Sequence, residues 1–236
     1  MDNSKNIKLI FGLIYGLILL IFLTFFFLNF DLKEITNYEF IKKNSQYFKS
    51  LRETNLIFIF LVLMFMIIMW VLMAGFLSPV AIICGFVLGK WMGTLCVVVG
   101  GSVGATLLYI IGKYFFYNFI KQKFSDKYIK LEKKFKKNEF SYFIIYRFIG
   151  GIPFAIANVL PVLFNVSIKN YFLGTFFGIL PQLFIISSLG SGLEKVILEN
   201  SSIPSLYSLI LTKEIYLPIL GFILIFIIGF LIKKRF

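Results

Sequence analysis

The stretch Arg147-Phe148-Ile149-Gly150-Gly151-Ile152-Pro153 interrupts an otherwise apolar part of the chain, and Asn158 and Pro161 follow it closely. An arginine inside an apolar segment costs about 2.5–3.5 kcal/mol on membrane-insertion scales. The glycine pair and the prolines release backbone groups that lipid cannot satisfy, so such backbone must be surrounded by protein or water. We therefore predict a broken, re-entrant helical hairpin here, and a functional site within it.

The composition is that of a polytopic membrane protein. Of the 236 residues, 59% are hydrophobic, and the mean hydropathy is +0.92. Such values predict an all-α membrane protein rather than a soluble domain. The chain has no histidine, which excludes His-dependent nucleophiles, zinc sites and proton relays. We expect no enzymatic activity, no cofactor and no metal, and we interpret Cys84 and Cys96 as small buried apolar residues.

Several apolar runs are long enough to cross a bilayer, whose core of ~30 Å needs about 20 helical residues. The sequence predicts about five transmembrane helices, at 7–30, 55–77, 95–116, 171–189 and 215–232. Polar segments at 31–54 and 191–214 are expected to be connectors.

A second punctuated region precedes the third of these helices. Its pieces are too short to span a membrane alone, so we predict another re-entrant hairpin. The residues expected to shape this hairpin are Pro79, Gly85, Gly89 and Gly93. The neighbouring Lys90-Trp91 pair is typical of an anchor at the membrane interface.

In the hairpin around Arg147, the shaping residues are expected to be Gly150, Gly151, Pro153 and Pro161. Arg147 has two interpretations. Its planar guanidinium suits an anionic headgroup, especially a phosphate, but it also resembles an interfacial arginine at the start of a span. Asn158 is a candidate for substrate binding as well, with structural capping as the alternative.

Small residues recur at four-residue spacing within the predicted helices, a pattern that lets another helix approach closely. The positions assigned to helix packing are Gly101, Gly104, Ala105, Gly174 and Gly178.

A basic amphipathic helix is predicted at 119–139. Ile120, Phe124, Tyr128 and Leu131 fall on one helical face, and eight lysines occupy the remainder. Such a helix is typical of a membrane surface, with a solvated helix docked on its own protein as the alternative. The formal charge of +13 lies between apolar spans, so we expect anionic lipids rather than nucleic acid as partners, with homo-oligomerisation possible.

Charge also predicts topology. The basic segment 119–139 and the tail Lys233-Lys234-Arg235 should both be cytoplasmic. In the favoured arrangement, the first hairpin enters the membrane and returns to the face from which it came. Residues 31–54 then lie on the cytoplasmic face, and the N-terminus lies outside. Two hairpins that enter from opposite faces would form an inverted repeat. In the alternative, the first punctuated region crosses fully and the N-terminus lies inside.

Acidic residues are missing from the predicted spans. The closest carboxylates, Glu139 and Glu194, flank them. A proton-coupled carrier usually needs a buried carboxylate, so this absence argues against proton coupling.

The chain resembles the VTT-domain, SNARE-associated branch of the DedA superfamily. Four features carry the resemblance: 76–93 with its glycines, the helix 101–113, Arg147-Phe148 with Pro153 and Asn158, and Gly174, Gly178 and Pro181. Three residues after the arginine this chain has Gly150, where many relatives have a proline. It also lacks an acidic residue in 76–93, where the bacterial DedA branch has one.

The resemblance implies two re-entrant hairpins and a role in moving lipids between leaflets, as a phospholipid scramblase or a polyprenyl-phosphate flippase. A small-solute or anion carrier, or a non-transporting scaffold, remains an alternative. The expected organisation is an N-terminal helix and connector at 1–54, a core at 55–195, and a connector with a last helix at 196–236. The bias toward Lys, Ile, Asn and Phe suggests an AT-rich bacterial genome, so we expect the protein to lie in a bacterial plasma membrane.

Overall fold

The computed structural model describes residues 14, 17, 20, 21, 24, 38–73, 75–123, 136–149, 154–199 and 210–235. Several predictions fall wholly or mainly outside them: the first transmembrane helix, the centre of the basic helix at 119–139, and Gly150, Gly151 and Pro153. The chain divides into two units, Met1–Asn44 and Ser45–Phe236, and the contacts given below lie within the second.

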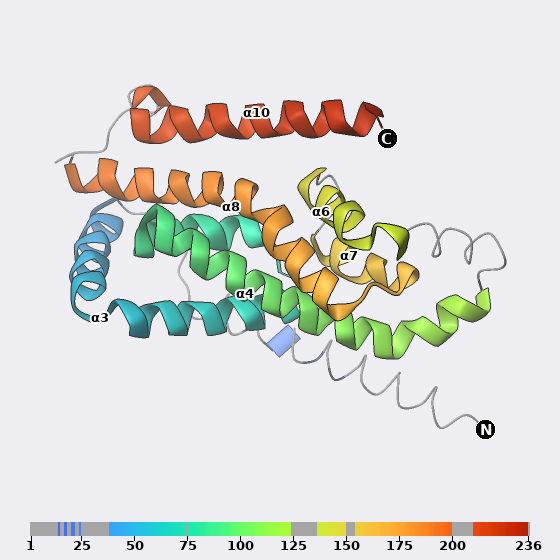
Figure 1. The fold of residues 1–236 in the computed structure, drawn as a ribbon. Coiled ribbons are helices and arrows are strands. Elements are labelled where there is room, and N and C mark those ends of the chain that lie inside the picture. Colours follow the sequence, from blue (N-terminus) through green and yellow to red (C-terminus); the bar gives the residue numbers. More distant parts are fainter. Residues whose placement is uncertain are drawn as a thin grey trace. The chain divides into compact units, whose positions relative to one another are not determined.

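Every regular element in the described residues is helical, which confirms the all-α class (Figure 1). The elements are α3 (Tyr38–Leu72), α4 (Leu77–Lys123), α6 (Glu139–Ile149), α7 (Phe154–Val159), the 3-10 helix η1 (Leu160–Phe164), α8 (Ile168–Glu199) and α10 (Lys213–Arg235). Within these residues, three helical stretches are long and apolar enough to cross a membrane: Lys42–Leu72, Leu77–Phe115 and Ile168–Glu199.

The second of these stretches is folded back on itself at Gly89. This residue has φ 77° and ψ 170°, so α4 consists of two helical segments, 77–88 and 90–123, joined by a sharp turn. A Cβ on Gly93 would lie 2.4 Å from the carbonyl oxygen of Cys84, so the segments touch through their backbones just below the turn. By length and composition, Leu77–Phe115 looks like a single span, but it consists of two helical segments that run in opposite directions.

The apolar part of α3 packs alongside both segments of α4. Arg52 donates a hydrogen bond to the Val87 carbonyl at 3.4 Å, near the turn. Further along, the Cys96 thiol is 3.5 Å from the Phe60 carbonyl oxygen, and a Cβ on Gly104 would meet Val71 at 2.8 Å. The apolar part of α3 thus runs parallel to 90–104 and antiparallel to 77–88.

The directions in which α3 and the two segments of α4 run bear on the membrane topology of the chain. Arg52 lies beside the Gly89 turn, whereas Lys123 ends a segment that extends about 50 Å away from that turn at 1.5 Å per residue. Residues near 52 and near 123 are therefore at opposite ends of the three segments. The arrangement fits the alternative topology, in which the chain crosses fully before 95, and does not fit the favoured one.

Of the four residues assigned to the first hairpin, only Gly89 lies at the turn. Pro79 lies in the first turn of α4, where its missing N–H has no helical partner to lose. Gly85 and Gly93 lie inside the two segments, where they permit backbone contact. The helix is therefore continuous through Pro79 and Gly85.

Replacing Gly89 with alanine should destabilise the protein, because the combination of φ 77° and ψ 170° is adopted almost only by glycine and costs a residue with a Cβ about 1–3 kcal/mol. For a chain of this size we expect the unfolding midpoint to fall by about 2–12 °C. Tryptophan fluorescence of the detergent-purified protein would measure it. Gly112→Ala is the matched control, because its Cβ would meet no atom closer than 3.4 Å. A midpoint unchanged by Gly89→Ala would contradict the turn.

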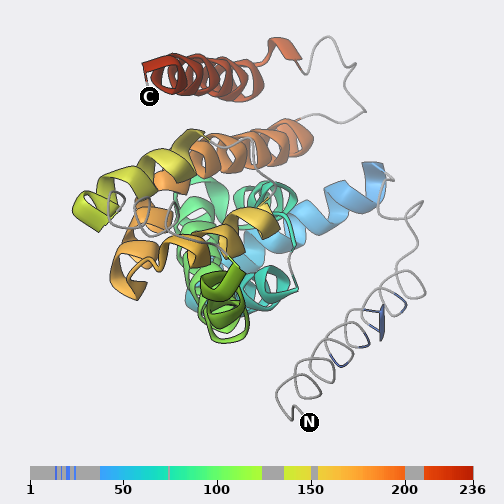
Figure 2. The same cartoon turned by 90° about the vertical axis from the view of Figure 1, so that its right-hand side faces the viewer.

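Helix α8 contacts both α6 and the segment 77–88 of α4. Its first half meets α6, where a Cβ on Gly174 would lie 2.6 Å from Phe143 and one on Gly178 would lie 2.4 Å from the Arg147 Cβ. Its second half meets the segment 77–88, where a Cβ on Gly190 would lie 2.0 Å from the Ile82 carbonyl oxygen. Helix α10 runs along α8 on another side (Figure 1; Figure 2).

Two expectations about the end of α8 are wrong. The predicted connector 191–214 does not begin at residue 191, because α8 continues to Glu199. Glu194 is therefore not a flanking residue: it lies within a candidate span and is buried, with 5% of its surface exposed. The chain does contain an intramembrane carboxylate candidate, and its partner is described below.

Candidate functional site: a buried arginine in the α6–α7 hairpin

Arg147 lies in the last turn of α6, the helix that begins the second hairpin. Only 5% of the residue is exposed. Burial follows from the packing of Gly178, which lacks a side chain and lets α8 press against the Arg147 stem. The interfacial interpretation, in which the arginine extends to solvent, therefore does not describe this residue.

The guanidinium of Arg147 is held by neutral oxygens from α8. Its Nε donates to the Thr175 hydroxyl at 3.1 Å, and Nη2 donates to the Tyr171 hydroxyl at 2.6 Å. Among the ion pairs of the described residues, none includes Arg147. The cation is thus buried in a polar but uncharged setting, which is costly for an isolated charge.

Aromatic rings form much of that setting. The guanidinium carbon is 5.2 Å from the ring centres of Phe143 and Tyr171, 5.7 Å from that of Phe154 and 6.0 Å from that of Tyr146. Rings at these distances attract a cation through their quadrupoles, by about 0.5–2 kcal/mol each. This attraction offsets part of the burial cost without neutralising the charge.

Asn158 lies on the other side of Tyr171 and is fully buried. The Tyr171 hydroxyl is 3.1 Å from the Asn158 backbone carbonyl oxygen and 3.4 Å from its side-chain Oδ1. The Nδ2 group of Asn158 has no hydrogen-bond partner in the structure. A buried amide donor without an acceptor costs about 1–3 kcal/mol, so this group calls for a ligand or a water.

Side chains satisfy the backbone carbonyls at the hairpin's helix ends. Gln182 Nε2 donates to the Phe148 carbonyl at 2.6 Å, and the Tyr146 hydroxyl donates to the Ala157 carbonyl at 3.2 Å. Such bonds satisfy carbonyl groups that the ends of helices leave without an intrahelical partner. They also fix the two arms of the hairpin, α6 and α7, relative to α8.

The structure brings Arg147 and Asn158 into one cluster, linked through Tyr171. Pro161 lies in η1, three residues after Asn158, and is buried. Glu139 is not near the cluster; its carboxylate accepts a hydrogen bond from the Ser167 backbone N–H. Gly101 packs against Leu77, and Ala105 is fully buried, so both contribute to the α4 interface rather than to the cluster.

Sequence reasoning identified Gly178 as a packing residue but missed Tyr171, Thr175 and Gln182, the polar residues of α8 around the arginine. The four residues are spaced by 4, 3 and 4, which places them on one helical face. This stripe of polar and small residues in an apolar run is the signal that points to them. Tyr109 of α4 completes the cluster by stacking on Tyr171, with ring centres 4.2 Å apart.

Comparison with known proteins agrees with this architecture. Residues 76–192 match the family model of the VTT domain. The chain is 26% identical over 78% of its length to the Transmembrane protein 41 homolog of Caenorhabditis elegans, of which it covers 82%. It is 30% identical over 52% of its length to Transmembrane protein 41B of Xenopus tropicalis and 27% identical over 52% to that of Homo sapiens. It covers only 41% and 40% of those two proteins.

No solved structure matches the chain. The apolar helices and the relatives define the class of protein, an integral membrane protein built from helices. More specifically, residues 76–192 match a VTT domain and the relatives are Transmembrane protein 41 proteins, which confirms the resemblance seen in the motifs.

Proposed function

We propose that this protein moves lipids between membrane leaflets and that Arg147 engages the lipid phosphate on the way. The observation that supports this is the buried guanidinium without a carboxylate partner in the described residues, next to the unsatisfied amide of Asn158. Both groups offer donors, and both would gain from an anionic acceptor. A phosphate is the anion that membrane lipids supply.

The contacts of Arg147 suit such a role. A guanidinium binds phosphate oxygens through parallel N–H donors, and the bonds are charge-assisted. Its present partners, the hydroxyls of Thr175 and Tyr171, are neutral, so a phosphate would form the stronger bonds. The composition supports a bacterial plasma membrane as the location.

Reconstitution would test the proposal. The full chain is placed in liposomes with a fluorescent phospholipid, and a membrane-impermeant quencher reports exchange between leaflets. We expect exchange well above that of empty liposomes. Arg147→Ala should reduce the rate at least tenfold, because a charge-assisted pair is worth about 1.5–3 kcal/mol. Arg147→Lys retains the charge but loses the planar fork, so its rate should be intermediate.

Lys169→Ala is the matched control, because it removes an exposed cation from α8 without touching the cluster. The thermal midpoint of each variant separates loss of function from loss of fold. Wild-type exchange in a folded Arg147→Ala protein would refute the role of Arg147. Flux of a small anion without lipid exchange would instead favour an anion carrier that uses the same cluster.

A further inference from the structure

A cavity of about 750 Å³ lies near the Gly89 turn, away from the Arg147 cluster. Its walls come from the start of α3, the turn residue Lys90, the second half of α8 and the first half of α10. Ligand sites in proteins typically have volumes of about 300–1,000 Å³. The cavity is therefore large enough for a lipid headgroup.

The charged lining of this cavity is unbalanced. Five cationic side chains against two carboxylates, Glu194 and Glu214, leave a net formal charge of +3. The cationic residues are Lys49, Arg52, Lys90, Lys195 and Lys213. A concave surface lined mainly by one sign of charge concentrates ions of the opposite sign.

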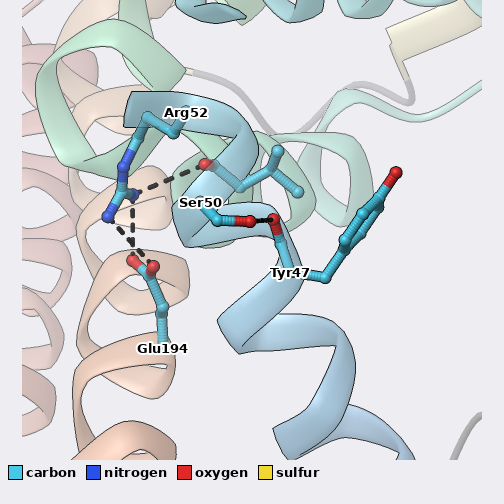
Figure 3. Close-up of polar contacts among 5 residues, drawn as sticks. Tyr47, Ser50, Arg52 and Glu194 are labelled. Atoms are coloured by element: carbon cyan, nitrogen blue, oxygen red, sulfur yellow. Dashed lines mark hydrogen bonds and ion pairs between the residues drawn. The ribbon is translucent and has the colours of Figure 1, made fainter. Parts of the chain in front are cut away.

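The two carboxylates are already occupied. Arg52 pairs with Glu194, with Nη2 to Oε1 and Nη1 to Oε2 both 3.1 Å, as Figure 3 shows. Lys195 pairs with Glu214. Among the ion pairs of the described residues, none includes Lys49, Lys90 or Lys213, and these three side chains are exposed.

The remaining wall is mostly apolar, with Ser188 and Ser191 as its uncharged polar side chains. Phe184 and Ile185 line it from α8, and Leu217 and Pro218 line it from α10. Cations above an apolar groove match an amphiphile that has an anionic head and a hydrocarbon tail. Free phosphate would use only the cationic part.

We propose that this cavity is a second anion site, which binds a phosphate group, either that of a lipid headgroup or free phosphate. Lys49, Lys90 and Lys213, the exposed lining cations outside the ion pairs, are its direct ligands, and the less exposed Arg52–Glu194 pair lies among them in the lining. Along α8, Glu194 of this cavity lies 19 residues, about 28 Å, from Thr175, and the nearest lining residue, Phe184, lies nine residues, about 13 Å, from Thr175. The site goes beyond the proposed function, because binding there does not require transport.

Native mass spectrometry of the detergent-purified full chain, titrated with dioleoylphosphatidic acid, would test the site. The double variant Lys90→Gln, Lys213→Gln should weaken the apparent affinity about twenty-five-fold, since each lysine near an anionic surface contributes about a factor of five. Lys137→Gln, Lys169→Gln is the matched control, because it removes the same charge from exposed positions outside the cavity. The control should bind as the wild type does.

Equal affinity in the two double variants would overturn the proposal. Because Arg147 is itself proposed to bind lipid phosphate, the titration is repeated in an Arg147→Ala background. The cavity variant should still lose affinity there, and no loss in that background would overturn the cavity site. Competition by inorganic phosphate distinguishes the two sources. Displacement of the lipid would show that phosphate alone suffices, whereas no displacement would show that the cavity requires the whole lipid.

Discussion

Replacing Gly190 with valine is expected to prevent the protein from accumulating in a folded form. Even the Cβ of an alanine at this position would lie 2.0 Å from the Ile82 carbonyl oxygen, and the reciprocal Cβ on Gly85 would lie 1.9 Å from that of Ser187. Both obstacles are backbone atoms, so no side chain can rotate away. Ordinary overpacking costs about 1–3 kcal/mol, and separating two helices should cost more than that.

Size-exclusion chromatography of a fluorescently tagged protein would measure the effect as loss of the monodisperse peak. Gly221→Ala is the matched control on α10, because its Cβ would meet only the flexible end of Ile185, at 3.2 Å. It should elute as the wild type does. A monodisperse Gly190→Val protein with an unchanged unfolding midpoint would show that α8 and the segment 77–88 are not in backbone contact.

Removing the charge of Glu194 should have the second largest effect. Its side chain is 7% exposed and pairs with Arg52, which is 25% exposed and also caps the Val87 carbonyl. Breaking a fully buried pair costs about 3–5 kcal/mol, and a solvent-exposed pair contributes about 0–1 kcal/mol. Because Arg52 is partly exposed, we expect Glu194→Gln to destabilise the protein by about 1–3 kcal/mol.

Thermal unfolding in detergent would measure this loss. Glu199→Gln serves as the control, since its side chain is 63% exposed and its contact with Lys195 is long, at 3.9 Å. It should leave the midpoint nearly unchanged. The double variant Arg52→Met, Glu194→Met should recover part of the loss, because it leaves no unpaired charge. Identical midpoints for Glu194→Gln and Glu199→Gln would contradict a stabilising pair.

Local patterns in the sequence predict the helical class and the approximate helix positions, because apolar runs of this length have few other structures available. They do not reveal which glycine turns the chain. Gly85, Gly89 and Gly93 look alike in the sequence, but two of them lie where helices touch and one has a positive φ. That difference depends on packing between segments, which no local pattern encodes.

In the candidate site, too, the sequence predicts one residue but not the residues that surround it. Arg147 is conspicuous because a cation in an apolar run is expensive wherever it lies. Its ligands are 24 and 28 residues further along the chain, and only the folded α8 brings them within hydrogen-bond distance. The sequence pattern places Glu194 in a connector because its neighbours are polar, whereas in the structure it is buried and pairs with Arg52 of α3, which is distant in sequence.

The double contact of α8 has a consequence for how such a protein can change over evolutionary time. One helix carries Gly178 against the Arg147 hairpin and Gly190 against the Gly89 hairpin, with Pro181 between them. A substitution that shifts α8 at one contact also shifts it at the other. Mutations in the two hairpins should therefore be tolerated in compensating pairs, so that positions without direct contact drift together rather than independently.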